Sequence, residues 1–360
     1  MNFFFSAQRL FAATSGAMFA VALLNAAASE RELAYISNQD AQIAVIDLTA
    51  QERIADIDSG ASSPRGIGIT ADGKLLVTAN GQSGDLSIID RASGALRKRV
   101  PIGKNPEFVR IRGDFAFVSF EPAAVGGPPP APGSEAAAAL AKEREDDDAE
   151  PARIAVIDLQ QGKVVREIVG GMETEGIEFS ADGKRLLITN EADDNVSVHD
   201  IASGKLLRRI STKKYGSRPR GIKVAPDGKS YGVTLEYGNK LLILDTAFKV
   251  KKVIPTGDTP YGLAFDRAGK RILVALAKGG AIQVFDAKTF TEIGRGTTGK
   301  RCWHFTFTPN DQQILVACGK SNEVVVLDAN SLQEVKRYPD FKTPWGVITW
   351  PKSVGSLDQP

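Results

Sequence analysis

The chain has 360 residues, with 45 Lys and Arg against 43 Asp and Glu and a formal net charge of +2. This balance gives no basic field of the kind that nucleic-acid-binding proteins present, so nucleic acid is not an expected partner. Two cysteines are too few for a disulfide framework, and two histidines are too few for a multi-copper or multi-haem centre built by the protein itself.

The N-terminal residues are typical of a secretory signal. Arg9 precedes a nearly unbroken apolar run that ends in small residues, and the small-x-small rule places cleavage after Ala28. We therefore expect a signal peptide at residues 1–28 and a periplasmic mature chain. A retained membrane anchor is the alternative, because the run approaches the roughly 20 residues of a spanning helix. We expect no membrane span in the rest of the chain.

The mature chain repeats one pattern, in which alternating apolar residues close on Asp before a turn and another short strand. The closing segments are QIAVID, LSIID, RIAVID, VSVHD, LLILD, IQVFD and VVVLD. Most recur at intervals of about 42 residues, the length of a four-stranded propeller blade. Turns such as ADGK and PDGK upstream indicate hairpins. The repeat predicts an all-β fold, a seven-bladed β-propeller over residues 29–351.

The two ends of the repeat region complement each other. The first copy lacks the leading strand of the others, whereas KTPWGVITWP at 342–351 is a strand without a blade. We expect this C-terminal strand to complete blade 1, which leaves no free sheet edge. Residues 352–360 are then a C-terminal tail.

The third copy contains an insertion at 121–152. Its Pro/Gly/Ala-rich opening and its charge run at 143–148 are typical of a flexible segment. We expect it to leave blade 3 between the second and third strands. Two interpretations stay open, a tolerated surface insertion and a lid or docking arm.

A short motif marks the start of each predicted innermost strand: SPRG, NPEF, ETEG, RPRG, TPYG, RCWH and TPWG. Pro and Gly recur there for backbone reasons, whereas the third position varies. Because these strand ends surround one mouth of the channel, the variable residues are candidate ligand-binding residues: Arg65, Glu107, Glu175, Arg220, Tyr261, Trp303 and Trp345. His304 joins them, since five other copies have Gly at its position. A structural plug made of an Arg–Glu network and aromatic rings is the alternative.

Stronger catalytic motifs are absent from the sequence. It has no nucleophile elbow with a His partner, no phosphate-binding Gly-rich loop, no H-E-x-x-H and no C-x-x-C-H. We therefore expect no catalytic residue, no dedicated metal site and no covalent c-type haem. The one alternative set for a metal is Glu107 and Glu175 with Asn80 or Asn190, which are oxygen ligands suited to Ca²⁺.

Cys302 and Cys318 flank a predicted hairpin whose turn is PNDQ. They stand at equal distance from Asn310, so an odd-length loop would set them opposite each other. A four-residue loop would offset them by one and turn them to opposite faces. The sequence is therefore compatible with two alternatives, a cross-strand disulfide and two buried thiols.

The strands LLVTAN, LLITN and AYISN, each followed by an x-V-x-x-D strand, resemble YVTN-family propeller repeats over nearly all of the mature chain. More narrowly, KRCWHFTFTP and TPWGV are similar to segments of the PQQ-dependent catabolism-associated β-propeller proteins. That resemblance implies a periplasmic quinoprotein dehydrogenase, a c-type cytochrome or an ABC-transport component as partner.

The main functional expectation is a non-catalytic periplasmic accessory propeller for PQQ-dependent alcohol oxidation. It would bind a protein partner or small ligand at the channel mouth and need no cofactor. The alternative is a redox or hydrolytic propeller with a channel-bound cofactor, either Ca²⁺ or noncovalent haem with His304 as ligand.

Overall fold

The computed structural model describes residues 31–121, 134–135 and 150–359. The predicted signal at 1–28 and most of the insertion at 121–152 lie outside the described residues. Within the described ranges, no helix is both long enough and apolar enough to cross a membrane.

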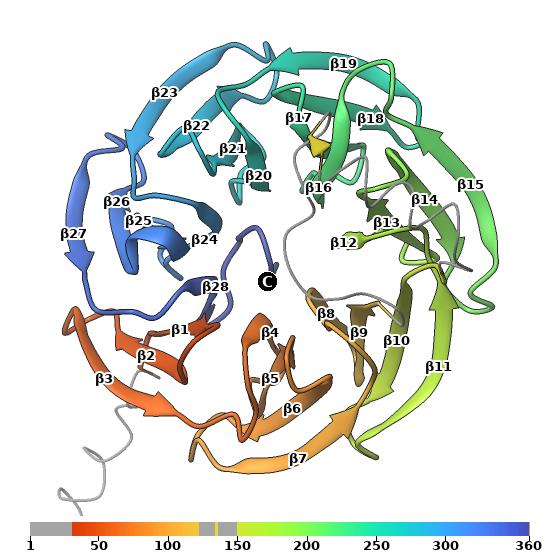
Figure 1. Ribbon diagram of the computed structural model, residues 1–360. Helices are drawn as coiled ribbons and strands as arrows, with labels where there is room; N and C mark the ends of the chain where they lie inside the picture. The colour runs from red at the N-terminus through yellow and green to blue at the C-terminus, as the bar shows by residue number, and fades with distance from the viewer. Residues whose placement is uncertain (1–30, 122–133, 136–149, 360) are drawn as a thin grey trace, which may run out of the picture. The chain divides into compact units, whose positions relative to one another are not determined.

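Seven four-stranded antiparallel sheets form a ring, which confirms the predicted seven-bladed propeller (Figure 1). Blade 1 contains β28 (Pro344–Trp350), β1 (Leu33–Asn38), β2 (Ile43–Asp47) and β3 (Glu52–Ile57). Blade 2 contains β4 (Pro64–Ile69), β5 (Leu75–Asn80), β6 (Asp85–Asp90) and β7 (Leu96–Pro101). Blade 3 contains β8 (Val109–Arg112), β9 (Phe115–Phe120), β10 (Arg153–Asp158) and β11 (Lys163–Val169).

The other blades follow in chain order. Blade 4 contains β12 (Thr174–Phe179), β13 (Arg185–Asn190), β14 (Asn195–Asp200) and β15 (Leu206–Ser211). Blade 5 contains β16 (Ser217–Val224), β17 (Ser230–Tyr237), β18 (Lys240–Asp245) and β19 (Val250–Pro255). Blade 6 contains β20 (Pro260–Phe265), β21 (Arg271–Leu276), β22 (Ala281–Asp286) and β23 (Glu292–Thr297). Blade 7 contains β24 (Cys302–Phe307), β25 (Gln313–Cys318), the short 3₁₀ turn η1 (Gly319–Ser321), β26 (Glu323–Asp328) and β27 (Glu334–Tyr338).

The C-terminal strand closes the ring as predicted. β28 pairs antiparallel with β1, and Leu33 lies opposite Trp350. The second and third strands of each blade are buried on both faces, because neighbouring blades pack against them; in β5, for example, all six residues are buried. The apolar cores between blades therefore hold the inner strands in place around the channel.

The outermost strands are the exposed edges of the ring. Each carries a β-bulge near its start, where one extra residue slips the pairing with the third strand. The bulged residues are Ile54, Arg97, Val165, Leu207, Lys251, Ile293 and Val335. Such bulges hinder edge-to-edge pairing with another chain.

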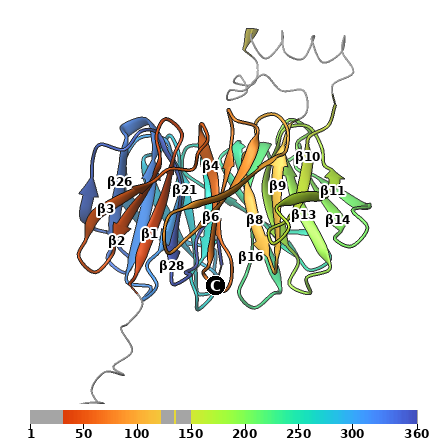
Figure 2. The same ribbon diagram turned by 90° about the horizontal axis from the view of Figure 1, so that it is seen from below.

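The C-terminal tail enters the channel instead of leaving the ring (Figures 1 and 2). It runs along β24, where Phe307 N–H donates to the Val354 carbonyl at 2.9 Å and Ser356 N–H donates to the Phe305 carbonyl at 2.9 Å. Leu357 is 2% exposed and belongs to the main hydrophobic cluster. The tail thus pairs with β24 at a single antiparallel bridge, Thr306 with Gly355, and fills part of the channel.

Candidate functional site

The channel mouth is built by a backbone feature that all seven blades share. The first residue of each entry motif has a positive φ between 49° and 61°, and none of these residues is glycine. They are Ser63, Asn105, Glu173, Arg218, Thr259, Arg301 and Thr343. This left-handed conformation is strained, most of all for the β-branched threonines. In blade 2 the pairing then slips, from Pro64↔Asn80 to Ile67↔Thr78, across the variable position.

Three of the predicted residues meet across blades 4, 5 and 6. Arg220 Nη1 lies 3.0 Å from Glu175 Oε2. The Tyr261 hydroxyl donates to Glu175 Oε1, and the Arg220 guanidinium lies 4.7 Å from the Tyr261 ring centroid. All three side chains are buried. They form a charged and hydrogen-bonded network across the channel.

Other members of this network were not predicted from the sequence. Glu236 at the end of β17 accepts from Arg220 Nε at 2.6 Å, and Glu191 after β13 contacts both Arg218 and Arg220. Arg301 lies 3.8 Å from Glu236. These residues occupy second-strand ends and strand entries, where the repeat gives no sign that they face the channel. Burial removes water from each of these charges, which costs free energy. The opposite charge of the partner offsets part of that cost.

Arg65 and Glu107 lie on the side of the mouth formed by blades 2 and 3. Arg65 Nη1 lies 3.4 Å from Glu107 Oε1, and each side chain is 17% exposed. Arg65 also donates to Gln39 Oε1 and to Asn105 Oδ1, both at 3.0 Å. Burial and the negative charge of Glu175 raise the pKa of Glu107 to about 7, against the lowering effect of Arg65. Glu107 is therefore a carboxyl that gains and loses a proton near neutral pH.

A cleft of about 930 Å³ is lined by Arg65, whereas Glu107 contacts Arg65 without lining the cleft itself. Its polar lining comes from Arg65 and from loops of blades 1 to 3, including Gln39, Ser63, Lys104 and Asn105. The volume falls in the range of small-molecule sites. The cleft was not predicted, because its walls are loops whose spacing depends on how neighbouring blades pack.

His304 lies below the charged network in a layer of aromatic rings. Its ring centroid is 4.3 Å from that of Trp345, 5.7 Å from Tyr261 and 5.9 Å from Phe108. Nδ1 bonds the Ser356 hydroxyl of the tail at 3.1 Å, and Nε2 has no hydrogen-bond partner. Burial, with the charges of Lys223 and Arg220, lowers the pKa of His304 well below its ordinary value. The imidazole is neutral.

This packing does not fit noncovalent haem. An axial ligand needs open space beside its free nitrogen for a tetrapyrrole, but His304 is 2% exposed, and rings from three other blades surround it. The tail covers its other nitrogen. The unpartnered Nε2 alone does not make a haem site.

The carboxylates also do not fit Ca²⁺. Glu175 is paired with Arg220 and Tyr261, and Glu107 with Arg65. Asn80 and Asn190 bond residues of their own blades, Asp85 and Asn195 among them, rather than the channel. In the parts of the chain that the structure describes, no group of three or more His, Cys, Asp or Glu side chains is arranged to hold a metal.

Trp303 packs against the hydrophobic cluster that contains Trp345, and the two cysteines flank the same hairpin. Trp303 packs over Gly319, where an added Cβ would come within 1.8 Å of the indole. Cys302 and Cys318 lie directly opposite each other and form a disulfide. The four-residue turn alone would offset them by one position, but a bulge at Trp303 shifts the register between Cys302 and His304 and brings the two sulfurs to one face.

A second charged layer lies deeper, where the tail ends. Arg110 Nη2 donates to Glu178 at 2.7 Å, and Nη1 donates to the Leu357 carbonyl at 2.6 Å. The Lys223 ammonium is 3.9 Å from Glu178 and donates to the Asp358 carbonyl at 3.5 Å. Burial lowers the pKa of Lys223 to about 7. The tail therefore satisfies buried cations at this depth and closes the channel below His304.

Comparisons with known proteins identify the architecture. No protein-family model matches the chain, and no curated protein matches it. The periplasmic gluconolactonase PpgL of Pseudomonas aeruginosa is similar in structure, with 15% identity and a TM-score of 0.69 over 89% of this chain and 99% of that one. A proposed 6-phosphogluconolactonase from Bacteroides uniformis has 16% identity and a TM-score of 0.70 over 89% and 100%. The dihydro-heme d1 dehydrogenase NirN has 18% identity and a TM-score of 0.63 over 88% and 74%.

These comparisons correct the main functional prediction. The leading interpretation, a non-catalytic accessory propeller for PQQ-dependent oxidation, was wrong, because several similar structures are named as lactonases and one as a dihydro-heme d1 dehydrogenase. The alternative, a hydrolytic or redox propeller, agrees better with them. At these identities the likeness itself shows a seven-bladed β-propeller and no particular substrate.

Proposed function

We propose that this propeller is a hydrolase that opens small, polar cyclic esters, with sugar lactones as the first candidates, at the cleft beside Arg65 and Glu107. The observation that carries the proposal is the pair itself. A carboxyl whose pKa is raised to about 7 lies 3.4 Å from a guanidinium that lines a cleft of about 930 Å³. A general base works best when its pKa lies near the operating pH. The names of the similar lactonases suggest the substrate class.

In this reaction, ionised Glu107 takes a proton from a water molecule as the water oxygen attacks the ester carbonyl. Arg65 donates hydrogen bonds to the oxygen that becomes negatively charged. The ring C–O bond then breaks, and the leaving alkoxide takes the proton back from Glu107. The product is an open hydroxy acid, and the carboxyl returns to its starting state.

The surroundings suit a polar substrate. Gln39 and Asn105 fix the direction of the Arg65 guanidinium by accepting hydrogen bonds from it, and both residues line the cleft. Lys104 adds an exposed cation at the same wall. Hydroxyl and carbonyl groups of a sugar lactone match these donors and acceptors.

The test is a pH-indicator assay of D-glucono-1,5-lactone and related lactones with the full chain, corrected for spontaneous hydrolysis. We expect enzyme-catalysed hydrolysis whose kcat/KM rises with pH to a plateau above pH 7, because the ionised form of Glu107 is the active base. Glu107→Gln keeps the shape but removes the base, so we expect a loss of about 100-fold or more. The matched control is Glu292→Gln, which removes an exposed carboxyl on β23 and should leave kcat/KM unchanged. Unchanged rates in Glu107→Gln, or no hydrolysis above the spontaneous rate, would refute the proposal.

The cellular setting also belongs to the proposal. A cleaved signal at residues 1–28 would place this hydrolase in the periplasm, the compartment that the resemblance to PQQ-associated YVTN propellers implies. N-terminal sequencing of the exported protein tests the site of cleavage after Ala28. A mature chain that still begins at Met1 would contradict it.

A further inference from the structure

The outer surface of blades 4 and 5 carries a cluster of cations that are not part of the channel mouth. Residues 201–226 and 246–257 contain no Asp or Glu. Eight of their cations are exposed on the outer strands β15 and β19 and the adjoining loops, and we call them the basic face. They are Lys205, Arg208, Arg209, Lys213, Lys214, Lys249, Lys251 and Lys252.

The basic face differs from the corresponding surface of other blades in its pairing. In blades 1, 2, 6 and 7 an outer-strand arginine has a carboxylate partner: Arg53–Asp56, Arg97–Asp90, Arg295–Glu292 and Arg337–Glu334. Within the described residues, none of the eight cations forms an ion pair with a carboxylate. Their positive charges are therefore available to an outside partner.

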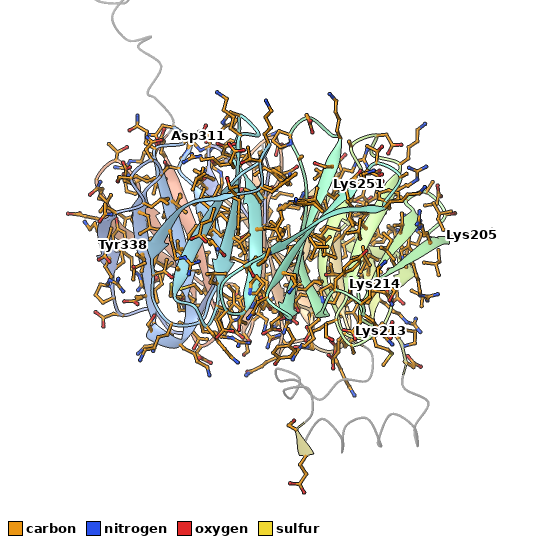
Figure 3. The ribbon with its side chains drawn as sticks, turned by 90° about the horizontal axis from the view of Figure 1, so that it is seen from above. Lys205, Lys213, Lys214, Lys251, Asp311 and Tyr338 are labelled. Atoms are coloured by element: carbon orange, nitrogen blue, oxygen red, sulfur yellow. A yellow bond between two sulfur atoms is a disulfide. The ribbon has the colours of Figure 1, made fainter. Side chains whose placement is uncertain are left out.

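The two strands form one continuous surface. Arg208 Nη1 on β15 donates to the Ala247 carbonyl before β19 at 2.8 Å, which joins the neighbouring outer edges. Figure 3 shows Lys205, Lys213, Lys214 and Lys251 on the same side of the ring, away from Tyr338. The bulge on β15 projects Leu207, which is 52% exposed, beside Arg208 and Arg209.

We propose that the basic face is a docking surface for a protein that presents an acidic patch. Charge complementarity gives the attraction, and arginine is the cation that binds carboxylates in a bidentate way. An exposed leucine among arginines is a composition typical of protein interfaces. The outer wall of a ring is convex, so that a flat bilayer would contact few of these side chains at once, whereas a protein surface can follow the curve.

Poly-L-glutamate labelled with fluorescein serves as the acidic probe, and fluorescence anisotropy measures its binding to the full chain. We expect saturable binding that weakens as the salt concentration rises from about 50 to about 200 mM, because screening shortens the reach of exposed charges. Reversing four charges on the basic face should weaken binding at least about tenfold. The variant is R208E/R209E/K251E/K252E.

The control reverses four surface arginines on blades 1, 6 and 7 that are paired with carboxylates, and it should bind the probe within about twofold of the wild type. The control variant is R53E/R267E/R295E/R337E. Circular dichroism checks that both variants are folded. Three results would overturn the proposal: no binding by the wild type at low salt, equal weakening in both variants, or tighter binding to vesicles of phosphatidylglycerol and phosphatidylcholine than to the probe.

Discussion

Replacing Glu107 by Gln should make the protein more stable at alkaline pH while it abolishes hydrolysis. The pKa of this carboxyl is about 7 in the folded chain against 4.5 for the ordinary group. Below pH 4.5 both the folded and unfolded chains hold the proton. Between pH 4.5 and 7 only the folded chain holds it, so stability falls as the pH rises through this window. Above pH 7 the folded chain has lost the proton too, and the change is complete.

The size of the effect follows from the shift. Raising the pKa from 4.5 to about 7 corresponds to about 3 kcal/mol, most of which develops between pH 5 and pH 8. Gln is neutral throughout and has nearly the same shape as Glu, so it can occupy the same place beside Arg65. We therefore expect the free energy of unfolding of Glu107→Gln, relative to the wild type, to rise by about 2 to 3 kcal/mol from pH 5 to pH 8.

Urea denaturation at the two pH values measures this difference directly. Glu292→Gln serves as the control, because its exposed carboxylate is held by Arg295, which keeps the pKa of Glu292 below its ordinary value. It should show no comparable rise between pH 5 and pH 8. If the relative stability of Glu107→Gln were the same at both pH values, Glu107 would not titrate near neutrality, and the argument for a general base at the mouth would fail.

Three further predictions concern the network, the disulfide and the tail. Arg220→Met leaves buried carboxylates without their cation and should lower the free energy of unfolding by about 3 to 5 kcal/mol. The control, Arg295→Met on the surface, should lower it by less than about 1 kcal/mol. Urea denaturation measures both changes. Replacing Cys302 and Cys318 by Ala opens a cross-link of sequence separation 16 and should cost about 3 kcal/mol. Ending the chain at Pro351 exposes the lower channel and should cost at least about 3 kcal/mol, seen as a lower Tm.

The sequence predicts the ring because each blade is specified locally. Alternating apolar residues and short turns, D-G in three of the blades, define the hairpins without reference to distant residues, and the unmatched strand at 342–351 indicates the closure between β28 and β1. The repeat also allows equivalent positions to be aligned. That alignment located the third motif position, where Arg65, Glu107, Glu175, Arg220 and Tyr261 lie at the mouth.

The details that the sequence did not predict depend on contacts between blades or on departures from the repeat. Glu191, just after β13, and Glu236, on β17, reach Arg220 from two blades, and no spacing within one repeat reveals that convergence. Trp303 shares its repeat position with channel-facing residues, but it packs over Gly319 instead. The disulfide depends on a bulge that a count of turn residues does not include. The tail has no repeat partner, so its course along β24 has no sequence signal.

The two ends of the channel have different roles for a physical reason. At the lower end, the tail supplies backbone carbonyls to Arg110 and Lys223, so cations that would be costly to bury are satisfied by the chain itself. At the mouth, Arg65 and Glu107 are only partly covered, and the carboxyl keeps a raised pKa instead of a fully stabilising partner. The pair at the mouth is therefore the more accessible of the two charged groups, whereas His304 is covered by the tail and by the Trp345 ring.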